Sequence, residues 1–167
     1  IGALVARDLL LFFMFWSLML ITLYCLIRRW GDKGRVSAAK KFLRFPLLAS
    51  GLMLGAILYI RTTVGSFDYA IVSDSFFADD EQFWLFTAFM ATFLILIPVI
   101  SMHRWYPDAH VQAPALASVV LTALGLNIGV YGILRIAIPL FPKAMGTYSP
   151  FLLLLSVGGV IFGLIRA

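Results

Sequence analysis

The sequence predicts an all-α membrane protein, a polytopic bundle of transmembrane helices in which one helix is broken by a proline. Of the 167 residues, 62% are hydrophobic and only 13% are charged, whereas an ordinary soluble domain has about 25% charged residues. A single globule of this size buries only about 70% of its unfolded surface. The excess apolar residues therefore require lipid or other membrane helices around them.

Five apolar stretches are predicted to cross the bilayer within one transmembrane domain that covers residues 1–167, since a span needs about 20 mainly apolar residues. They lie at about 9–27, 45–60, 84–102, 115–140 and 150–165. The fifth is the weakest, because its glycines favour close helix contact over exposure to lipid. The chain begins with Ile1 inside an apolar stretch, so we expect it to be a fragment of a longer protein.

The positions of the charged residues predict the orientation and the partners. Seven of the 13 basic residues lie together, namely Arg28, Arg29, Lys33, Arg35, Lys40, Lys41 and Arg44. The connection at 61–83 instead carries mainly carboxylates, so the loop at 28–44 is predicted to face the cytoplasm and the connection at 61–83 to face away. This clustering accounts for the net charge of +5 without a nucleic-acid partner. The expected surroundings are the lipid bilayer and other membrane helices.

Cysteine usage predicts neither a Cys-rich metal site nor a disulfide framework. Cys25 is the single cysteine, and it lies inside an apolar run. No metal site and no cofactor is expected in this chain.

Ionisable residues and a proline inside the spans are candidates for function, because charges are costly in lipid. Asp8, next to Arg7, lies near the outer mouth of the first span. It either forms part of a helix-end pair or couples to a neighbouring helix or subunit. Pro98 should kink or break the third span. Such a break either marks an ion site, as in transporters, or is a structural kink.

The junction between the third and fourth spans is rich in polar residues. His103, Asp108 and His110 lie within it and could relay protons or hold the connection by hydrogen bonds. In the fourth span Asn127, Tyr131 and Arg135 are four residues apart and share one helix face. Hydrogen bonding between helices explains this stripe as well as an ion path does. The candidates for a proton path are Asp8, His103, Asp108, His110, Asn127 and Arg135.

Several strings of residues carry a family resemblance. They are His103-x-Trp105-x-Pro107-Asp108-Ala109-His110-x-x-Ala113-Pro114, Gly129-Val130-Tyr131-Gly132-Ile133-Leu134-Arg135, Pro139-Leu140-Phe141-Pro142 and, in the first span, Leu11-Phe12-Phe13-Met14-Phe15-Trp16 after Asp8. With them the chain resembles the proton-antiporter-like membrane subunits of respiratory complex I, in particular NADH-quinone oxidoreductase subunit M and its mitochondrial equivalent. The Trp-x-Pro-Asp core is shared with related hydrogenase and multisubunit cation/proton antiporter chains.

The resemblance implies a place in a larger assembly. The chain would be the middle part of a longer subunit, from the end of its fourth helix to its ninth, and would form an antiporter-like half-repeat. Its partners would be the other membrane subunits of the complex, in the bacterial cytoplasmic (inner) membrane or, alternatively, the mitochondrial inner membrane. It would be a non-catalytic subunit of an NADH-quinone oxidoreductase, with the redox cofactors held by other subunits.

The charges that the family is thought to use for proton translocation are replaced here. The resemblance places a glutamate after the Phe-Trp of the first span, a lysine two residues before the proline of the broken helix, and a lysine in the next helix. These positions hold Ser17, Leu96 and Asn127. Either ions still move along His103, His110, Asn127 and water, or the chain is a diverged structural subunit that does not pump. The missing charges favour the second hypothesis.

Overall fold

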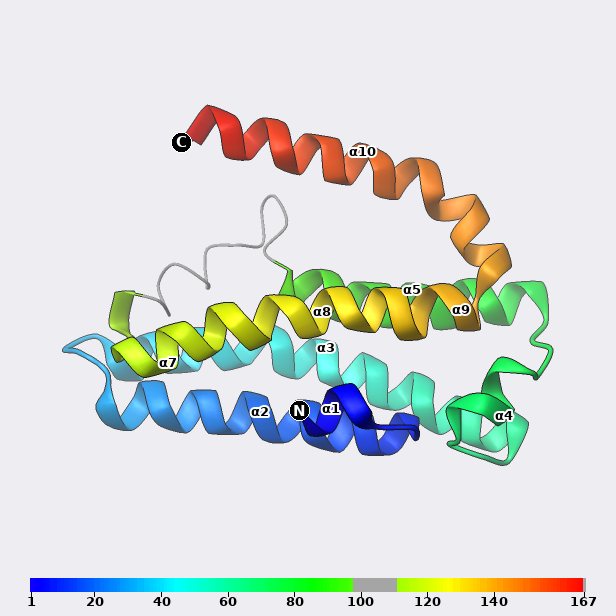
Figure 1. Ribbon diagram of the computed structural model, residues 1–167, viewed down its shortest axis with the longest axis horizontal. Helices are drawn as coiled ribbons and strands as arrows, with labels where there is room; N and C mark the ends of the chain where they lie inside the picture. The colour runs from blue at the N-terminus through cyan, green and yellow to red at the C-terminus, as the bar shows by residue number, and fades with distance from the viewer. Residues whose placement is uncertain (98–110, 167) are drawn as a thin grey trace.

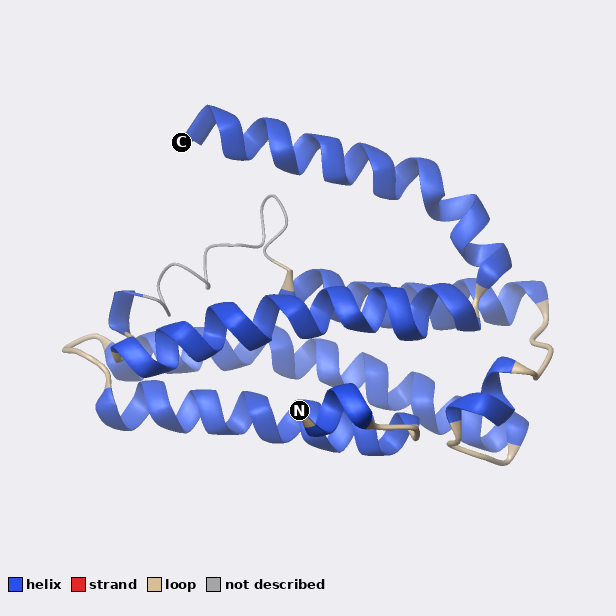
Figure 2. Cartoon of the chain, viewed as in Figure 1, coloured by secondary structure: helices blue, strands red, loops and turns tan. Residues whose placement is uncertain are grey.

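The computed structural model describes residues 1–97 and 111–166, and the regular elements within these ranges are helices (Figure 2). Four helical stretches of the described part are long and apolar enough to cross a membrane. They are Leu9–Trp30, Arg35–Val64, Ala117–Leu140 and Pro142–Phe162. The predicted class, an all-α membrane protein, is confirmed. The five span boundaries stay a prediction, because the third runs into residues that the structure does not describe.

The first two long helices form an antiparallel hairpin. The short α1 (Gly2–Val5) precedes α2 (Leu9–Trp30), which is followed by α3 (Arg35–Val64). The sequence predicted a basic loop at 28–44, but only residues 31–34 lie outside the two helices. That loop prediction is wrong in extent, because arginine and lysine are good helix formers and a helix continues beyond the membrane boundary.

The connection at 61–83 contains a short helix and buried side chains. Helix α3 ends at Val64, where Gly65 adopts a left-handed φ of 81° that favours glycine. The short helix α4 (Tyr69–Ser73) follows and buries Val72 completely. Phe77 is also buried. This connection therefore closes one end of the bundle, which we call the α4 end.

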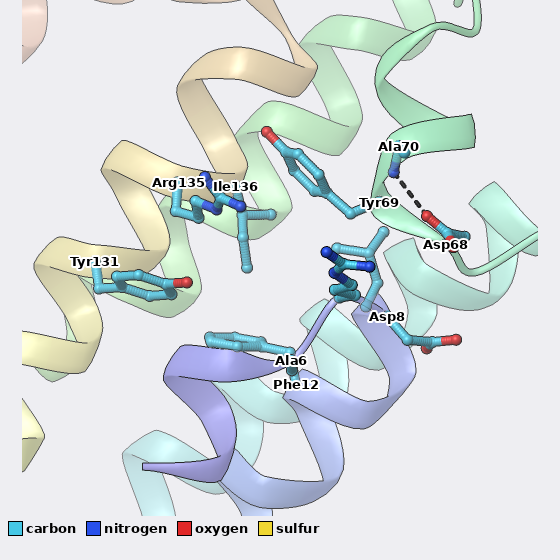
Figure 3. Close-up of a pocket in the computed structure, with 11 residues that line it drawn as sticks. Ala6, Asp8, Phe12, Asp68, Tyr69, Ala70, Tyr131, Arg135 and Ile136 are labelled. Carbon is cyan, nitrogen blue, oxygen red and sulfur yellow. Dashed lines mark hydrogen bonds between the residues drawn. The ribbon is translucent and has the colours of Figure 1, made fainter.

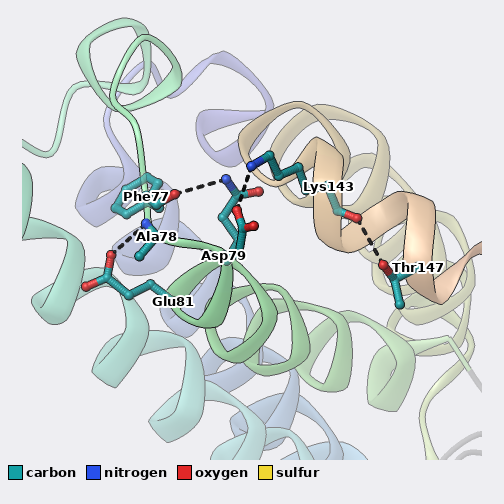
Figure 4. Close-up of polar contacts among 7 residues, drawn as sticks. Phe77, Ala78, Asp79, Glu81, Lys143 and Thr147 are labelled. Atoms are coloured by element: carbon teal, nitrogen blue, oxygen red, sulfur yellow. Dashed lines mark hydrogen bonds and ion pairs between the residues drawn. The ribbon is translucent and has the colours of Figure 1, made fainter.

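Helix α5 (Asp79–Leu96) is fixed at its start by charged side chains (Figure 4). The Ala78 N–H donates to Glu81 Oε2 at 3.0 Å, and Lys143 Nζ lies 2.6 Å from Asp79 Oδ1. Both members of that ion pair are well exposed, so the pair contributes little stability. The ion pair instead fixes position, because it joins the start of α5 to the first turn of the helix that contains Lys143.

The end of α5 lies where the sequence predicted a broken helix. The last helical residue is Leu96, and Ile97 has extended backbone with φ −79° and ψ 113°. A residue before proline is pushed towards this conformation. Pro98 itself lies outside the described residues.

The predicted fourth span is a continuous but irregular helix. It comprises α7 (Ala115–Val120), the π-helical turn η1 (Leu121–Gly125), α8 (Leu126–Gly132), a second π-helical turn η2 (Ile133–Ala137) and α9 (Ile138–Leu140). The sequence did not predict the two π turns. Such turns are rare and often occur at functional sites.

Aromatic rings fill the centre of the bundle. The Trp16 ring lies 6.0 Å from Phe12 and 5.8 Å from Phe93, and Phe93 lies 6.2 Å from Phe89. Trp16 Nε1 donates to Ser50 Oγ at 3.0 Å, which ties α2 to α3. These contacts make α2, α3 and α5 a packed unit.

Helix α10 (Pro142–Arg166) leaves this unit (Figure 1). Its first turns pack on α5, where the Tyr148 ring stacks on Phe86 at 5.5 Å. Further along, its large apolar side chains, such as Leu154 and Leu164, are exposed. Helix α10 therefore presents an apolar surface that the described part of the chain does not cover.

Candidate functional site: a cavity at the α4 end

A cavity of about 360 Å³ lies at the α4 end, between the start of α2, helix α4 and the turn η2 (Figure 3). Its polar lining residues are Arg7, Asp8, Asp68, Tyr69, Tyr131 and Arg135. Asp8 and Arg135 were predicted as separate candidates from opposite ends of the sequence. The structure brings both into one cavity.

A pair of backbone hydrogen bonds frames one wall of the cavity. The Leu9 N–H donates to Phe67 O at 3.0 Å, and the Tyr69 N–H donates to Arg7 O at 2.9 Å. Asp8 and Asp68 are thereby paired as an isolated antiparallel bridge. We call these two bonds the Asp8–Asp68 strap.

Both aspartates of the strap cap helices. Asp8 Oδ1 accepts from the backbone N–H of Leu10 at 2.8 Å and of Leu11 at 3.2 Å, so it caps α2. Asp68 Oδ1 accepts from the Ala70 N–H at 2.8 Å and caps α4. A carboxylate at a helix N-terminus satisfies free N–H groups and interacts favourably with the helix dipole. These contacts make Asp8 the cap of α2; its predicted pairing with Arg7 or with a neighbouring helix or subunit stays a prediction.

The opposite wall carries a cation and two tyrosines. The Arg135 guanidinium lies over the Tyr69 ring, 5.4 Å from its centroid. The Tyr131 O–H donates to Leu4 O at 2.8 Å and so joins α8 to α1. Burial raises the pKa of the Tyr69 phenol above its ordinary value, while the charge of Arg135 opposes that rise. The Tyr69 hydroxyl therefore stays protonated at neutral pH.

The three positions where the resemblance places charges do not form a polar path in the described structure. Ser17 lines a cavity of about 200 Å³ between α2 and α3. Leu96 is 3% exposed and borders a different cavity of about 10 Å³. Asn127 is exposed, and its Nδ2 donates to Ala123 O at 2.6 Å. Leu20 borders both cavities, so an apolar side chain lies between them.

Gln112 has a structural role that the sequence analysis missed. The Gly34 N–H donates to its Oε1 at 3.0 Å, and the Asp32 N–H donates to its backbone O at 3.1 Å. Gln112 therefore holds the turn between α2 and α3. Gln112 could have been noticed, because it belongs to the polar string at 103–114. Its hydrogen-bond partners near residue 34 lie far away in the sequence, so the contact itself could not be predicted. The other candidates in that string, His103, Asp108 and His110, lie outside the described residues.

No cluster of three or more histidine, cysteine, aspartate or glutamate side chains that could hold a metal ion occurs among residues 1–97 and 111–166. Cys25 is exposed on α2.

Known proteins match the chain along nearly its whole length. The family model described as "NADH:quinone oxidoreductase/Mrp antiporter, TM" matches residues 6–167. NADH-ubiquinone oxidoreductase chain 4 of Arabidopsis thaliana is 40% identical, over 93% of this chain and 32% of that protein. NADH-quinone oxidoreductase subunit M is 38% identical in Pseudomonas aeruginosa and 37% in Escherichia coli K12, each over 98% of this chain and 34% of the relative.

A solved structure agrees with these relatives. A chain of respiratory complex I from Thermus thermophilus with bound NADH superposes with a TM-score of 0.83 at 32% identity, covering 90% of this chain and 32% of that chain. The chain thus spans about a third of the length of these proteins. The resemblance predicted from its motifs is confirmed, and the chain belongs to the NADH:quinone oxidoreductase/Mrp antiporter transmembrane family.

Proposed function

We propose that this chain is the middle part of an antiporter-like subunit in the membrane arm of a complex-I-like NADH-quinone oxidoreductase. The match over residues 6–167 and the relatives named for that oxidoreductase support this placement. Its partners are then the other membrane subunits and the lipid bilayer of a bacterial cytoplasmic or mitochondrial inner membrane. The redox cofactors belong to other subunits of the assembly.

We further propose that this stretch of the subunit works without the charge switch that its family pattern implies. The observation that carries this proposal is the packing around Leu96. Its cavity of about 10 Å³ is lined by apolar side chains from α2, α3 and the fourth span. A site of that size holds about one water at most, and a water needs polar partners. None of the described residues that line this cavity titrates, and its volume leaves no room for a water chain.

The buried polar side chains of the described residues also favour a structural role. They are Ser50, Gln82 and Thr92. Each donates to a backbone carbonyl, from Ser50 Oγ to Pro46 O at 2.7 Å, from Gln82 Nε2 to Phe77 O at 3.2 Å and from Thr92 Oγ1 to Ala49 O at 2.8 Å. None of these groups titrates near neutral pH, whereas a proton relay needs a group that does. These bonds join or stiffen helices.

The test replaces Asn127 with alanine in the full subunit of the assembled complex. Asn127 occupies a family lysine position, and its side chain bonds the backbone four residues earlier. We expect Asn127→Ala to reduce the amount of assembled complex more than the number of ions moved per electron. Thr22→Ala is the matched control, because Thr22 Oγ1 makes the same kind of bond, to Leu18 O at 2.8 Å, outside the family positions.

The assay measures complex content, electron transfer and ion flux in reconstituted vesicles. A normal amount of complex with a clearly lower ion-to-electron ratio in Asn127→Ala, and an unchanged ratio in Thr22→Ala, would contradict the proposal. It would show that the chain still moves ions.

A second function, a subunit of a multisubunit cation/proton antiporter, is favoured by the family description, which includes the Mrp antiporters. Purification of the tagged full subunit from native membranes separates the two. NADH-quinone oxidoreductase activity that purifies with the tag supports the first function. Cation/proton exchange without that activity supports the second.

A further inference from the structure

The cavity at the α4 end contains positive charge that the described residues leave without a carboxylate partner. Arg7 and Arg135 both line it, and no described carboxylate lies within 4 Å of either guanidinium. Arg135 belongs to the apolar stretch Ala117–Leu140, where a charged side chain is costly unless it is paired. The ring of Tyr69 is a weak partner compared with an anion.

The two aspartates of the cavity do not supply that anion. Asp8 and Asp68 each accept through Oδ1 from N–H groups at the N-termini of α2 and α4. In Figure 3 both carboxylates lie on the side of the cavity away from Tyr131 and Arg135. On its Tyr131 and Arg135 side, the cavity is therefore bordered by the Arg135 guanidinium and the tyrosine rings, and the two carboxylates border it on the other side.

The height of the cavity in the bilayer indicates what fills it. Asp8 directly precedes the apolar helix α2, and Arg135 lies near the end of the stretch Ala117–Leu140. The cavity thus lies at the ends of two candidate membrane spans, the level at which the hydrocarbon gives way to the head groups if these helices cross the bilayer. Tyrosines are typical of this boundary, and phospholipid phosphates lie at the same level.

We propose that this cavity binds a phosphate group between Arg7 and Arg135. A guanidinium offers a planar fork of donors that matches phosphate oxygens, and such charge-assisted bonds are among the strongest in proteins. The volume of about 360 Å³ is near the lower limit of about 300 Å³ for small-ligand sites. It accommodates a phosphate with a short attached group, and the apolar side chains of Phe12 and Ile136 border the remainder.

The first experiment measures phospholipid that stays with the full complex purified in mild detergent, by quantitative mass spectrometry. The variants are Arg135→Gln and Arg7→Gln. Arg61→Gln is the matched control, because Arg61 also lies over a ring, 5.2 Å from the centroid of Phe67, but does not line the cavity. We expect each cavity variant to retain about tenfold less anionic phospholipid, as for one lost charge-assisted contact, and the control to match the wild type.

The second experiment identifies the source of the phosphate. Delipidated complex is titrated with inorganic phosphate, with short-chain phosphatidylglycerol and with a neutral detergent of equal chain length, and the unfolding temperature is followed. Stabilisation by phosphatidylglycerol alone identifies a lipid head group, whereas stabilisation by inorganic phosphate identifies a free anion. Either result supports the site when Arg135→Gln abolishes it.

Three results would overturn the proposal. The first is that neither phosphate compound stabilises the wild type, in which case an acidic group elsewhere in the full protein pairs with the arginines. The second is equal binding in the wild type and Arg135→Gln, and the third is an equal loss in the Arg61→Gln control. If Arg135→Gln does not assemble, Arg135→Lys replaces it. It keeps the charge but loses the fork, so it should bind more weakly, and unchanged binding would likewise contradict the proposal.

Discussion

Replacement of Gly132 by alanine tests the contact on which the packing of the fourth span against α5 depends. A Cβ atom at Gly132 would lie 2.2 Å from Cε1 and 2.4 Å from Cζ of the Phe93 ring. Phe93 is fully buried, and the rings of Phe12, Trp16 and Phe89 surround it. The ring therefore has no free space to move into, so α8 must shift away from α5.

The magnitude follows from two opposing effects. Overpacking a closed core costs about 1–3 kcal/mol, and a separation of 2.2 Å places this contact at the upper end. Alanine recovers about 1 kcal/mol through its better helix propensity. We therefore expect Gly132→Ala to lower the free energy of unfolding by about 2 kcal/mol.

The control is Gly55→Ala in α3, where nothing lies within 4 Å of an added Cβ. It should raise the free energy of unfolding by about 0.5–1 kcal/mol, so the two variants should differ by about 3 kcal/mol. The assay is equilibrium unfolding of the full subunit in lipid nanodiscs. Equal stability of Gly132→Ala and the wild type would refute the predicted clash.

A double-mutant cycle assigns the effect to the ring of Phe93. Phe93→Leu removes the ring atoms that an alanine at Gly132 would meet. The double variant should be more stable than the sum of the single effects predicts, by at least about 0.5 kcal/mol. Strict additivity would show that the two positions do not interact.

Three further predictions concern orientation and local contacts. In a cysteine-free background, cysteines at Ser37 and Ser73 should react with impermeant reagents from opposite faces, Ser37 from the cytoplasm, and labelling from one face would contradict the orientation. Trp16→Phe should cost about 2 kcal/mol of unfolding free energy, because it loses the bond to Ser50 Oγ and leaves a cavity. A cost below the error of the assay would contradict that role. Gln112→Ala should speed hydrogen exchange in the turn between α2 and α3, whereas Gln112→Glu, which keeps an oxygen acceptor, should not; equal exchange in both variants would contradict the contact.

The fold class could be predicted from the sequence because a helix that crosses the bilayer needs about 20 mainly apolar residues in a row. Long apolar runs mark α2 and α3 without ambiguity. Their ends could not be predicted as well, because hydropathy marks the membrane boundary, whereas backbone hydrogen bonding marks the helix boundary. Arg28 and Lys40 lie outside the apolar runs and still belong to helices. The π turns within 115–140 were missed because a wider turn has no distinctive composition.

The candidate site could be predicted only in parts. Asp8 and Arg135 attract notice as charges beside apolar runs, but their meeting depends on α4 and on the Asp8–Asp68 strap. The strap consists of backbone bonds, which leave no side-chain pattern to recognise. Tyr69 was missed for the same reason, since its role follows from the position of α4 against η2.

The strap also limits how the helices can move. Sliding α2 along its axis by one residue, about 1.5 Å, would break both backbone bonds that join it to the connection after α3. At the α4 end, helix α2 and the connection after α3 can therefore slide along the helix axis only together. Among the described residues the fourth span is joined to this end through side chains instead, by Tyr131 to Leu4 O in α1 and by Arg135 to the Tyr69 ring in α4. Axial motion at this end would occur between these two parts, along the cavity at the α4 end.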